Sequence, residues 1–340
     1  MFSISNVMMS SADFSPMTEL TALTVKGAGL SAITMPEAAI EELNLDSNSL
    51  SSIDLSKYAS SLKYLFLNSN QFTEFDASAY PNLMLLGMNN NQLTKIKLDN
   101  EWMWQLALST NQLPEIDLTG VPRMEQISLD HNQLETLDVT GLNDLRVLLI
   151  DNNKFRFSTL PKDNGYTLYS YSNQADLPVE LVNGEVDLSS EAVIDGVETV
   201  YRWFVSKPYL DEYGELTGEE LYVDDEYNTD KGVTYFHTMI DNIVGALTNE
   251  TFPKLTLYTK AFDITTTGID AISTDETCVN VENGCIVATN CGNNTMRVYG
   301  ANGALICTAA PANGVAATSQ LLPGIYVVAI ANTTTKVVVK

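Results

Sequence analysis

The stretch LKYLFLNSNQFTEF, residues 62–75, decides the fold of the first half of this chain. It places apolar side chains and one asparagine at fixed intervals, which are Leu62, Leu65, Leu67, Asn70, Phe72 and Phe75. Five further copies keep this spacing, and successive asparagines lie 22, 21, 20, 21 and 21 residues apart. The six asparagines are Asn48, Asn70, Asn91, Asn111, Asn132 and Asn153. This agreement predicts one structural unit repeated about every 21 residues.

The repeat predicts a solenoid in which every turn adds one short strand to a parallel sheet. The leucines of each turn point inward and stack on those of the next turn. A buried asparagine side chain bonds backbone groups that the tight turn after the strand leaves unpaired. The second half of several turns alternates apolar and acidic residues, as in residues 53–55 and 116–118, both IDL. We therefore expect an extended or 3-10 convex side, little helix and a mainly β fold class.

The copies resemble the leucine-rich repeats of bacterial cell-surface proteins, over about residues 20–158. The resemblance implies that the concave sheet binds a partner through the variable positions of each strand. Exposed aromatic residues in a concavity mark an interface. The candidate binding residues of the concave face are Tyr64, Phe66, Leu85, Trp104, Gln105 and Gln126. Alternatively, the aromatic residues shield the sheet or pack on an N-terminal cap.

The chain has 340 residues, 18 basic against 43 acidic side chains, and a net charge of -25. This excess of acid argues against binding to nucleic acid or to anionic lipid, because both need clustered Lys and Arg. The sequence contains no stretch of 18 apolar residues, so we expect no membrane-spanning helix. Residues 1–16 lack the basic and continuous apolar regions of a signal peptide. We expect an extracellular or cell-surface protein whose signal peptide is not part of this sequence.

The repeat pattern stops after Pro161, and short strand-like runs follow it in residues 161–265. These runs are Tyr166–Tyr171, Val197–Val205, Gly232–His237, Ile243–Leu247 and Leu255–Ile264. Regular short strands without helical periodicity favour a β-sandwich. Trp203 occupies the place of the core tryptophan of an immunoglobulin-like strand. The segment resembles the Ig-like modules that follow repeats in bacterial surface proteins, although no cysteine pair flanks the tryptophan.

Acidic residues are most concentrated between residues 211 and 230, where no Lys or Arg occurs. Calcium is the functional interpretation, with Asp224, Asp225 and Glu226 as candidate ligands, because hard cations prefer carboxylate oxygens. The run lacks the spacing of an EF-hand loop, so we favour a solvated hairpin and predict no metal site and no cofactor. The two histidines suggest no catalytic residue: His131 lies at a variable loop position and His237 in a strand.

All four cysteines fall in the last segment, residues 266–340, as Cys278, Cys285, Cys291 and Cys307. An even, local cluster suits disulfides in an oxidising compartment, and the pairings Cys278–Cys291 and Cys285–Cys307 are two of the open possibilities. Zinc is disfavoured because the sequence has no C-x-x-C pair. Asn-Gly at residues 283–284 predicts a two-residue hairpin that places Glu282 opposite Cys285 and Cys278 opposite Thr289.

The end of the chain resembles the C-terminal sorting domain of the type IX secretion system in Bacteroidetes-type surface proteins. The resemblance is carried by residues 296–303 (MRVYGANG), 323–328 (PGIYVV) and 336–340 (KVVVK). It implies a small C-terminal β-sandwich that directs export across the outer membrane. Alternatively, this segment is a β-meander that caps the Ig-like domain.

These patterns predict three domains: a solenoid with an N-terminal cap in residues 1–160, an Ig-like β-sandwich in 161–265, and a sorting-like β-domain in 266–340. The function they favour is a secreted or surface-anchored, non-catalytic adhesion protein that binds an extracellular protein or glycan of unknown identity. A self-assembling structural component is one alternative. A glycan-active enzyme is another, although the sequence contains no G-x-S-x-G, phosphate-binding glycine loop or H-E-x-x-H.

Overall fold

The computed structural model describes residues 1–182, 185–221, 228–229, 232–236, 240–264, 278–282, 284–291, 294–300, 303–330 and 333–339. They form strands and turns, with three 3-10 helices and no α-helix among the described residues: η1 (Ser56–Tyr58), η2 (Ala77–Ala79) and η3 (Ser189–Glu191). The chain divides into two compact units, Met1–Thr267 and Gly268–Lys340. Within the described part of the chain, no helix is long and apolar enough to cross a membrane.

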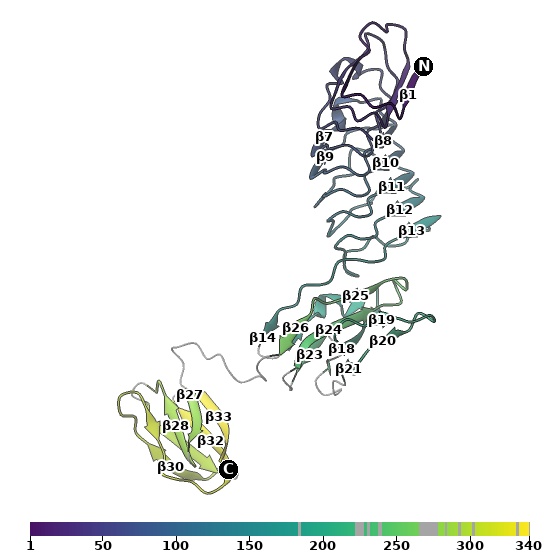
Figure 1. The fold of residues 1–340 in the computed structure, drawn as a ribbon. Coiled ribbons are helices and arrows are strands. Elements are labelled where there is room, and N and C mark those ends of the chain that lie inside the picture. Colours follow the sequence, from purple (N-terminus) through teal and green to yellow (C-terminus); the bar gives the residue numbers. More distant parts are fainter. Residues whose placement is uncertain are drawn as a thin grey trace. The chain divides into compact units, whose positions relative to one another are not determined.

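The first unit is built on a nine-stranded parallel sheet to which each turn of the solenoid contributes one strand (Figure 1). In sheet order the strands are β1 (Phe2–Ser5), β3 (Ala22–Lys26), β5 (Glu42–Asn44), β6 (Tyr64–Phe66), β8 (Leu85–Gly87), β10 (Gln105–Ala107), β11 (Gln126–Ser128), β12 (Val147–Leu149) and β13 (Leu168–Ser170). Neighbouring strands pair one full repeat apart, so that Leu43 lies opposite Leu65 and Leu65 opposite Leu86. These three leucines are fully buried. The predicted fold class is confirmed in its main part, a mainly β solenoid with turns of about 21 residues and little helix.

The residue directly before each of the six repeated asparagines has a left-handed backbone conformation, which turns the chain out of the strand. Its φ lies between +53° and +58° at Ser47, Ser69, Asn90, Thr110, His131 and Asn152. Short polar residues, asparagine above all, tolerate this conformation better than apolar ones. The repeated backbone turn explains why the position is polar in every copy although its residue type varies.

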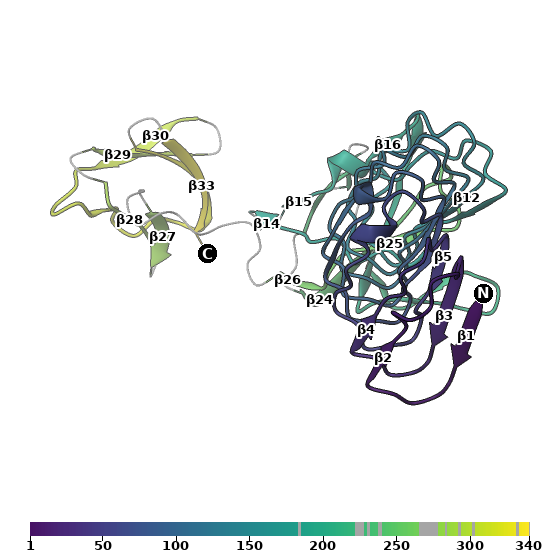
Figure 2. The ribbon, with the colours of Figure 1, turned by 90° about the horizontal axis from the view of Figure 1, so that it is seen from above.

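The convex side is extended or 3-10, as predicted. β2 (Ser11–Asp13) pairs in parallel with β4 (Ala32–Thr34), and β7 (Glu74–Asp76) pairs in the same way with β9 (Lys95–Lys97). Both pairs lie across the solenoid from the nine-stranded sheet, as the views in Figures 1 and 2 show. An aspartate opens several convex turns and accepts a backbone hydrogen bond two residues later, for example Asp117 from the amide of Thr119 at 2.9 Å.

The sheet extends beyond both predicted ends of the repeat. The interpretation that the repeat stops after Pro161 is wrong, because β13 pairs in parallel with β12 and places Leu168 opposite Val147. Residues 1–19 likewise add a further turn rather than a separate cap, since β1 pairs in parallel with β3. Phe2 lies opposite Leu23, and so it continues the column of inward apolar residues.

Two antiparallel sheets follow the solenoid within the first unit. One has the order β14 (Leu181–Val182), β15 (Glu185–Asp187), β23 (Val233–Tyr235), β22 (Asn228–Thr229). The other has the order β21 (Glu220–Leu221), β18 (Val200–Val205), β24 (Ile240–Thr248), β25 (Thr256–Tyr258), and β26 (Phe262–Ile264) also pairs with β24. Two short hairpins complete this part: β16 (Val193–Ile194) with β17 (Val197–Glu198), and β19 (Tyr209–Leu210) with β20 (Leu216–Thr217).

Trp203 on β18 is the buried centre of these sheets. Its ring meets Phe236 and Phe262 edge-on, at centroid distances of 5.0 and 5.8 Å. Gly245 on β24 provides the space, because a Cβ there would lie 2.7 Å from the indole ring. Trp203 can therefore occupy the core, as predicted, because the residue opposite it on the neighbouring strand is a glycine.

The antiparallel sheets cover the C-terminal end of the solenoid. Phe252 stacks on Phe157 and meets Tyr171 edge-on, with ring centroids 6.2 and 5.6 Å apart. The carboxylate of Glu191 accepts hydrogen bonds from the amide and hydroxyl of Ser158. Solenoid and sheets therefore share one continuous core, in agreement with their membership of one compact unit.

The second unit contains two antiparallel sheets around its own core. Their orders are β27 (Cys278–Glu282), β28 (Cys285–Thr289), β31 (Ala316–Ala317), and β30 (Leu305–Ala309), β29 (Met296–Gly300), β32 (Gly324–Ile330), β33 (Thr333–Val339). The predicted hairpin register is confirmed: Glu282 pairs with Cys285, and Cys278 with Thr289. Asn283 of the predicted turn lies outside the described residues.

The two cysteine pairings considered from the sequence are not formed. Cys285, Cys291 and Cys307 are free thiols. Cys285 lies on β28 and Cys307 on β30, and these strands belong to different sheets. Cys291 is buried instead, with its Sγ 3.3 Å from the carbonyl oxygen of Ala288.

Candidate functional site

The outward side chains of the parallel sheet form two rows along the solenoid, and we call these rows the sheet face. From β5 to β13, the first row contains Glu42, Tyr64, Leu85, Gln105, Gln126, Val147 and Leu168. The second row contains Asn44, Phe66, Gly87, Ala107, Ser128, Leu149 and Ser170. Glu42 is the single charged residue in these rows, although the chain has a net charge of -25. Beyond Glu42, the sheet face is therefore an uncharged strip on a strongly acidic protein.

Five of the six residues predicted from the sequence belong to these rows, Trp104 lies directly before them, and all six are partly exposed. Tyr64 lies opposite Leu85, Leu85 opposite Gln105, and Gln105 opposite Gln126, on neighbouring strands about 4.8 Å apart. Trp104 directly precedes β10, where its amide donates to the Met84 carbonyl at 3.0 Å. The structure therefore brings these side chains to four successive strands of one surface.

Gly87 leaves space beside Asn68 and Phe66 of the neighbouring turn. A Cβ at Gly87 would stand 3.4 Å from Cδ1 of Phe66 and 3.1 Å from Nδ2 of Asn68. A side chain at Gly87 would therefore crowd the Asn68 amide, whereas its Cβ would only touch the edge of the Phe66 ring. Together with Tyr64 and Leu85, Phe66 forms the first apolar patch of the sheet face.

A second apolar patch at the C-terminal end of the strip escaped the sequence analysis. It consists of Val147, Leu149 and Leu168, and Leu168 is 50% exposed. Gln105, Gln126 and their neighbours separate it from the first patch by about four strand spacings, or roughly 19 Å. Leu168 was not recognised as part of the sheet because it lies beyond Pro161, where the repeat was predicted to end.

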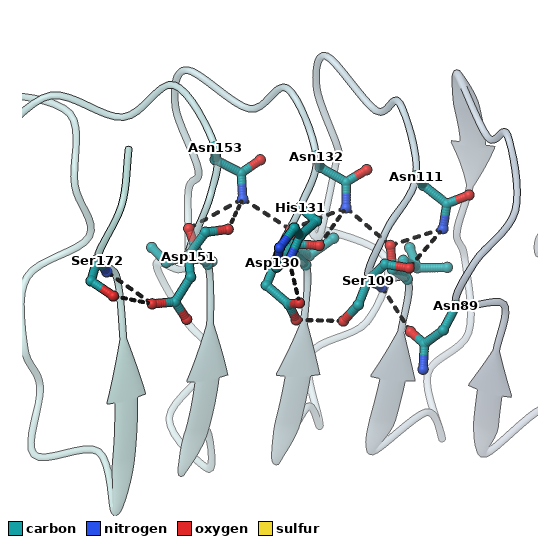
Figure 3. Close-up of polar contacts among 12 residues, drawn as sticks. Asn89, Ser109, Asn111, Asp130, His131, Asn132, Asp151, Asn153 and Ser172 are labelled. Carbon is teal, nitrogen blue, oxygen red and sulfur yellow. Dashed lines mark hydrogen bonds and ion pairs between the residues drawn. The ribbon is translucent and has the colours of Figure 1, made fainter. Parts of the chain in front are cut away.

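The ladder asparagines fix the turn next to the sheet face. Asn111 is typical: its Nδ2 donates to the carbonyls of Met88 and Leu108 at 3.0 and 2.9 Å. Its Oδ1 accepts from the amide of Leu93 at 2.9 Å. All six side chains are buried and repeat this pattern, and Figure 3 shows the bonds donated by Nδ2 of Asn111, Asn132 and Asn153. Each asparagine therefore connects two turns of the solenoid.

A second polar ladder runs along the carboxyl ends of the strands, two residues before the first ladder, and the sequence analysis did not identify it. Its members are Asp46, Asn68, Asn89, Ser109, Asp130, Asp151 and Ser172. Neighbouring members are linked across turns in five of the six pairs, as when the amide of Asn89 donates to Oδ1 of Asn68 at 2.8 Å. Figure 3 shows the later links, including those from Ser172 to Asp151. The available signal was a polar residue after the last strand position of every copy.

Ser109, Asp130 and His131 are the residue types of a hydrolase triad, but their connections are different. The hydroxyl of Ser109 donates to Asp130, and Nδ1 of His131 lies 3.0 Å from the other oxygen of the same carboxylate. In a triad the imidazole bonds the nucleophilic hydroxyl and the carboxylate orients the imidazole. Here the carboxylate stands between the other two groups (Figure 3). The arrangement serves the second ladder rather than activating the serine.

The remaining predicted site residues lie elsewhere. The calcium candidates Asp224, Asp225 and Glu226 and the strand residue His237 are outside the described residues. Among the residues that the structure describes, no cluster of three or more His, Cys, Asp or Glu side chains is arranged to hold a metal ion.

Solved structures that resemble this chain contain leucine-rich repeats. The functional domain of InlJ from Listeria monocytogenes, which includes a cysteine ladder, is 18% identical over 72% of this chain and 63% of its own, with a TM-score of 0.34. The leucine-rich repeat domain of APL1B is 19% identical over 45% of this chain and 54% of its own, with a TM-score of 0.33. The LRR protein LIC12759 of Leptospira interrogans is 16% identical over 45% of this chain and 60% of its own, with a TM-score of 0.29. This chain therefore spans less than two thirds of each. No family model matches the sequence. No curated protein matches it either.

Proposed function

We propose that this protein is a non-catalytic binding protein that uses the sheet face to recognise an extracellular protein. The observation that carries the proposal is the uncharged strip itself. Net repulsion keeps most of the acidic surface away from other acidic proteins, whereas the strip presents aromatic, aliphatic and amide groups. Charge depletion and aromatic enrichment are the compositional marks of the centre of a protein interface.

The order of side chains along the strip supports a polypeptide ligand. Tyr64 and Phe66 are residue types that serve as anchors in interfaces, and the second patch repeats an apolar contact about 19 Å away. Gln105 and Gln126 lie between the patches and supply both donors and acceptors for a partner's backbone. A glycan is the second candidate, because aromatic rings and amides also suit sugar faces and hydroxyls.

The distribution of carboxylates supports a binding role over a glycosidase. Glycoside hydrolysis needs two carboxyl groups facing one substrate bond at about 5–10 Å. From β5 to β13 the two rows of the sheet face contain one carboxylate, Glu42. Carboxylates also flank the rows: Glu41 and Glu125 lie beside Lys63 and Arg146, and Asp130 and Asp151 are engaged in the second ladder.

For the segment after the solenoid, we propose an Ig-like spacer domain. Its sheet orders, β14-β15-β23-β22 and β21-β18-β24-β25, correspond to the A-B-E-D and C′-C-F-G orders of immunoglobulin sandwiches. The buried Trp203 on β18 then occupies strand C. The end of the chain keeps its resemblance to a type IX sorting domain, and with it the proposal of export to the surface of a Bacteroidetes-type bacterium.

The test is binding of the whole chain to a panel of extracellular-matrix proteins and to a glycan array. The double variant Tyr64→Ala plus Phe66→Ala removes the first apolar patch and should weaken binding at least tenfold, because interface aromatics dominate affinity. Tyr209→Ala plus Tyr213→Ala is the matched control, since these tyrosines are 65% and 82% exposed and lie away from the solenoid. Equal affinity of both variants for the captured ligand would refute the proposed site.

A further inference from the structure

A hollow opens on the convex side of the solenoid, beside β7 and β9 (Figure 1). Its volume is about 590 Å³, and three successive turns line it, through residues such as Ser52, Phe75 and Lys95. β7 and β9 pair with each other, whereas residues 51–53 of the preceding turn form no strand. The hollow therefore lies where the convex strand pairing ends, across the solenoid from the sheet face.

The inner wall of the hollow is apolar and rigid. Phe75 is partly exposed and stacks on Tyr80, with ring centroids 6.0 Å and planes 14° apart. The buried Phe72 meets Phe75 edge-on at 6.4 Å. Ile53 of the preceding turn completes this wall. The packed rings therefore offer a ligand a flat apolar surface that is fixed in advance.

The hydroxyl of Tyr80 has no hydrogen-bond partner among the described residues, although the side chain is only 7% exposed. Buried polar groups normally have a partner. Tyr58 shows the usual arrangement, because it stands as far after Asn48 as Tyr80 does after Asn70, and its hydroxyl donates to the carbonyl of Pro36. Tyr80, unlike Tyr58, lines the hollow and leaves its hydroxyl to a ligand there.

Burial, together with Asp54 and Asp76, raises the pKa of Tyr80. The hydroxyl therefore stays protonated at neutral pH and can donate a hydrogen bond as well as accept one.

The charges around the hollow cancel. Lys95 lies opposite Glu74, and Lys97 opposite Asp76, with Nζ of Lys97 3.7 Å from Oδ2 of Asp76. All four side chains are exposed and line the hollow. An anionic ligand would meet the two carboxylates and a cationic ligand the two ammonium groups. The rim therefore suits an uncharged ligand that carries many donors and acceptors.

We propose that this hollow binds a neutral sugar, as one or two rings of a glycan. The C–H face of a sugar ring packs on Phe75, while its hydroxyls accept from Lys95 and Tyr80 and donate to Asp76. The volume lies in the range of about 300–1,000 Å³ that is usual for small-molecule sites. Because the hollow is open to solvent on one side, the dissociation constant is about 1 mM. The site is separate from the sheet face and does not depend on the function proposed for it.

The experiment is saturation-transfer NMR and calorimetric titration of the whole chain with glucose, galactose, mannose, cellobiose and lactose. Each of the three hexoses is compared with its uronic acid and its 2-amino sugar. At least one neutral sugar should bind, and more tightly than its charged counterparts.

Two variants locate the binding in the hollow. Tyr80→Phe keeps the stacked ring and should weaken binding by about three- to tenfold, the value of one hydrogen bond. Tyr58→Phe is the matched control, because this hydroxyl lies at the equivalent position outside the hollow. Phe75→Leu keeps an apolar side chain but removes the ring, and should bring the affinity below detection. Phe66→Leu makes the same change on the sheet face and should leave sugar binding intact.

The proposal would be overturned if no neutral sugar bound the wild type, or if a uronic acid or amino sugar bound more tightly. Equal affinity of the wild type and Tyr80→Phe would also overturn it, as would equal weakening by Phe75→Leu and Phe66→Leu. Urea unfolding of each variant establishes that it is folded. None of these outcomes affects the sheet face, which is tested separately by Tyr64→Ala plus Phe66→Ala.

Discussion

Replacing Asn111 by leucine tests whether the asparagine ladder stabilises the solenoid. The substitution removes three hydrogen bonds of 2.9–3.0 Å, two donated by Nδ2 and one accepted by Oδ1. Their loss does not affect all three partners equally. The carbonyl of Met88 still accepts from Asn91 at 3.1 Å, and the carbonyl of Leu108 still accepts from Asn132 at 3.0 Å.

The amide of Leu93, in contrast, loses its acceptor in a buried site. A stranded buried amide costs roughly 2 kcal/mol, and the two other lost bonds cost roughly 1 kcal/mol each. The leucine side chain buries more apolar area than asparagine and returns about 1 kcal/mol of this. The expected loss is about 3 kcal/mol of unfolding free energy, or about 6–12 °C in Tm for a unit of this size.

Thermal and urea unfolding of the whole chain, followed by circular dichroism, measure this loss. Gln112→Leu is the matched control, because Gln112 is exposed and adjacent to Asn111. Surface substitutions of this kind usually change stability by less than about 0.5 kcal/mol. If Asn111→Leu behaved like Gln112→Leu, the buried hydrogen bonds between turns would not be a source of stability.

Two further predictions concern the convex side. Hydrogen bonds from the backbone amide and hydroxyl of Thr119 lower the pKa of Asp117, so the folded state gains stability above the unfolded pKa of 3.8 and loses it as the pH falls through the lower folded pKa. Asp117→Asn keeps an oxygen acceptor but does not titrate. The urea midpoint of this variant should therefore fall less than that of the wild type between neutral and acidic pH. If the urea midpoints of both proteins fell by the same amount, Asp117 would not have this role. Gly120→Ala should cost about 1–3 kcal/mol, because its Cβ would lie 2.7 Å from the carbonyl oxygen of Leu98. Gly324→Ala is the control, since its Cβ would lie 3.6 Å from Tyr326, an ordinary contact distance. If both substitutions lowered the unfolding free energy of their units equally, the steric argument would be refuted.

Periodicity made the solenoid predictable because the same contacts recur in every turn. An inward leucine in one copy implies an inward leucine in the next, and six copies fix both spacing and register. The hairpin between β27 and β28 was predictable for a local reason: a two-residue Asn-Gly turn determines which residues lie opposite each other.

The end of the repeat was missed because different residues there perform the same role. Gln174 takes the ladder position, and its Nε2 donates to the carbonyls of Ile150 and Tyr171 at 3.0 and 2.9 Å. Its Oε1 accepts from the amides of Asn153 and Phe155. Tyr169 and Tyr171 replace the usual leucines, and Tyr171 is covered by Phe252, which follows β24, rather than by another turn. A search for asparagine and leucine at fixed spacing therefore misses this turn, although its glutamine and tyrosines make the same kinds of contact.

The second polar ladder escaped for a related reason. Its position is occupied by aspartate, asparagine and serine in turn, and these share only a short side chain with an oxygen acceptor. Whether that oxygen reaches the neighbouring turn depends on the left-handed residue that follows, and this conformation is visible only in the backbone.

The two ladders together explain how short strands can present the proposed binding surface. Each strand from β5 to β13 has only three residues, too few to hold their side chains rigidly on their own. Directly after its strand, every turn from Asn48 to Gln174 is held by buried hydrogen bonds to the preceding turn, and most turns are also linked through the second ladder. Tyr64 and Leu168, at the outer ends of the two apolar patches, are therefore fixed about 24 Å apart before any partner arrives. A partner that contacts both patches loses little free energy in ordering this surface, so affinity depends on the partner's own rigidity.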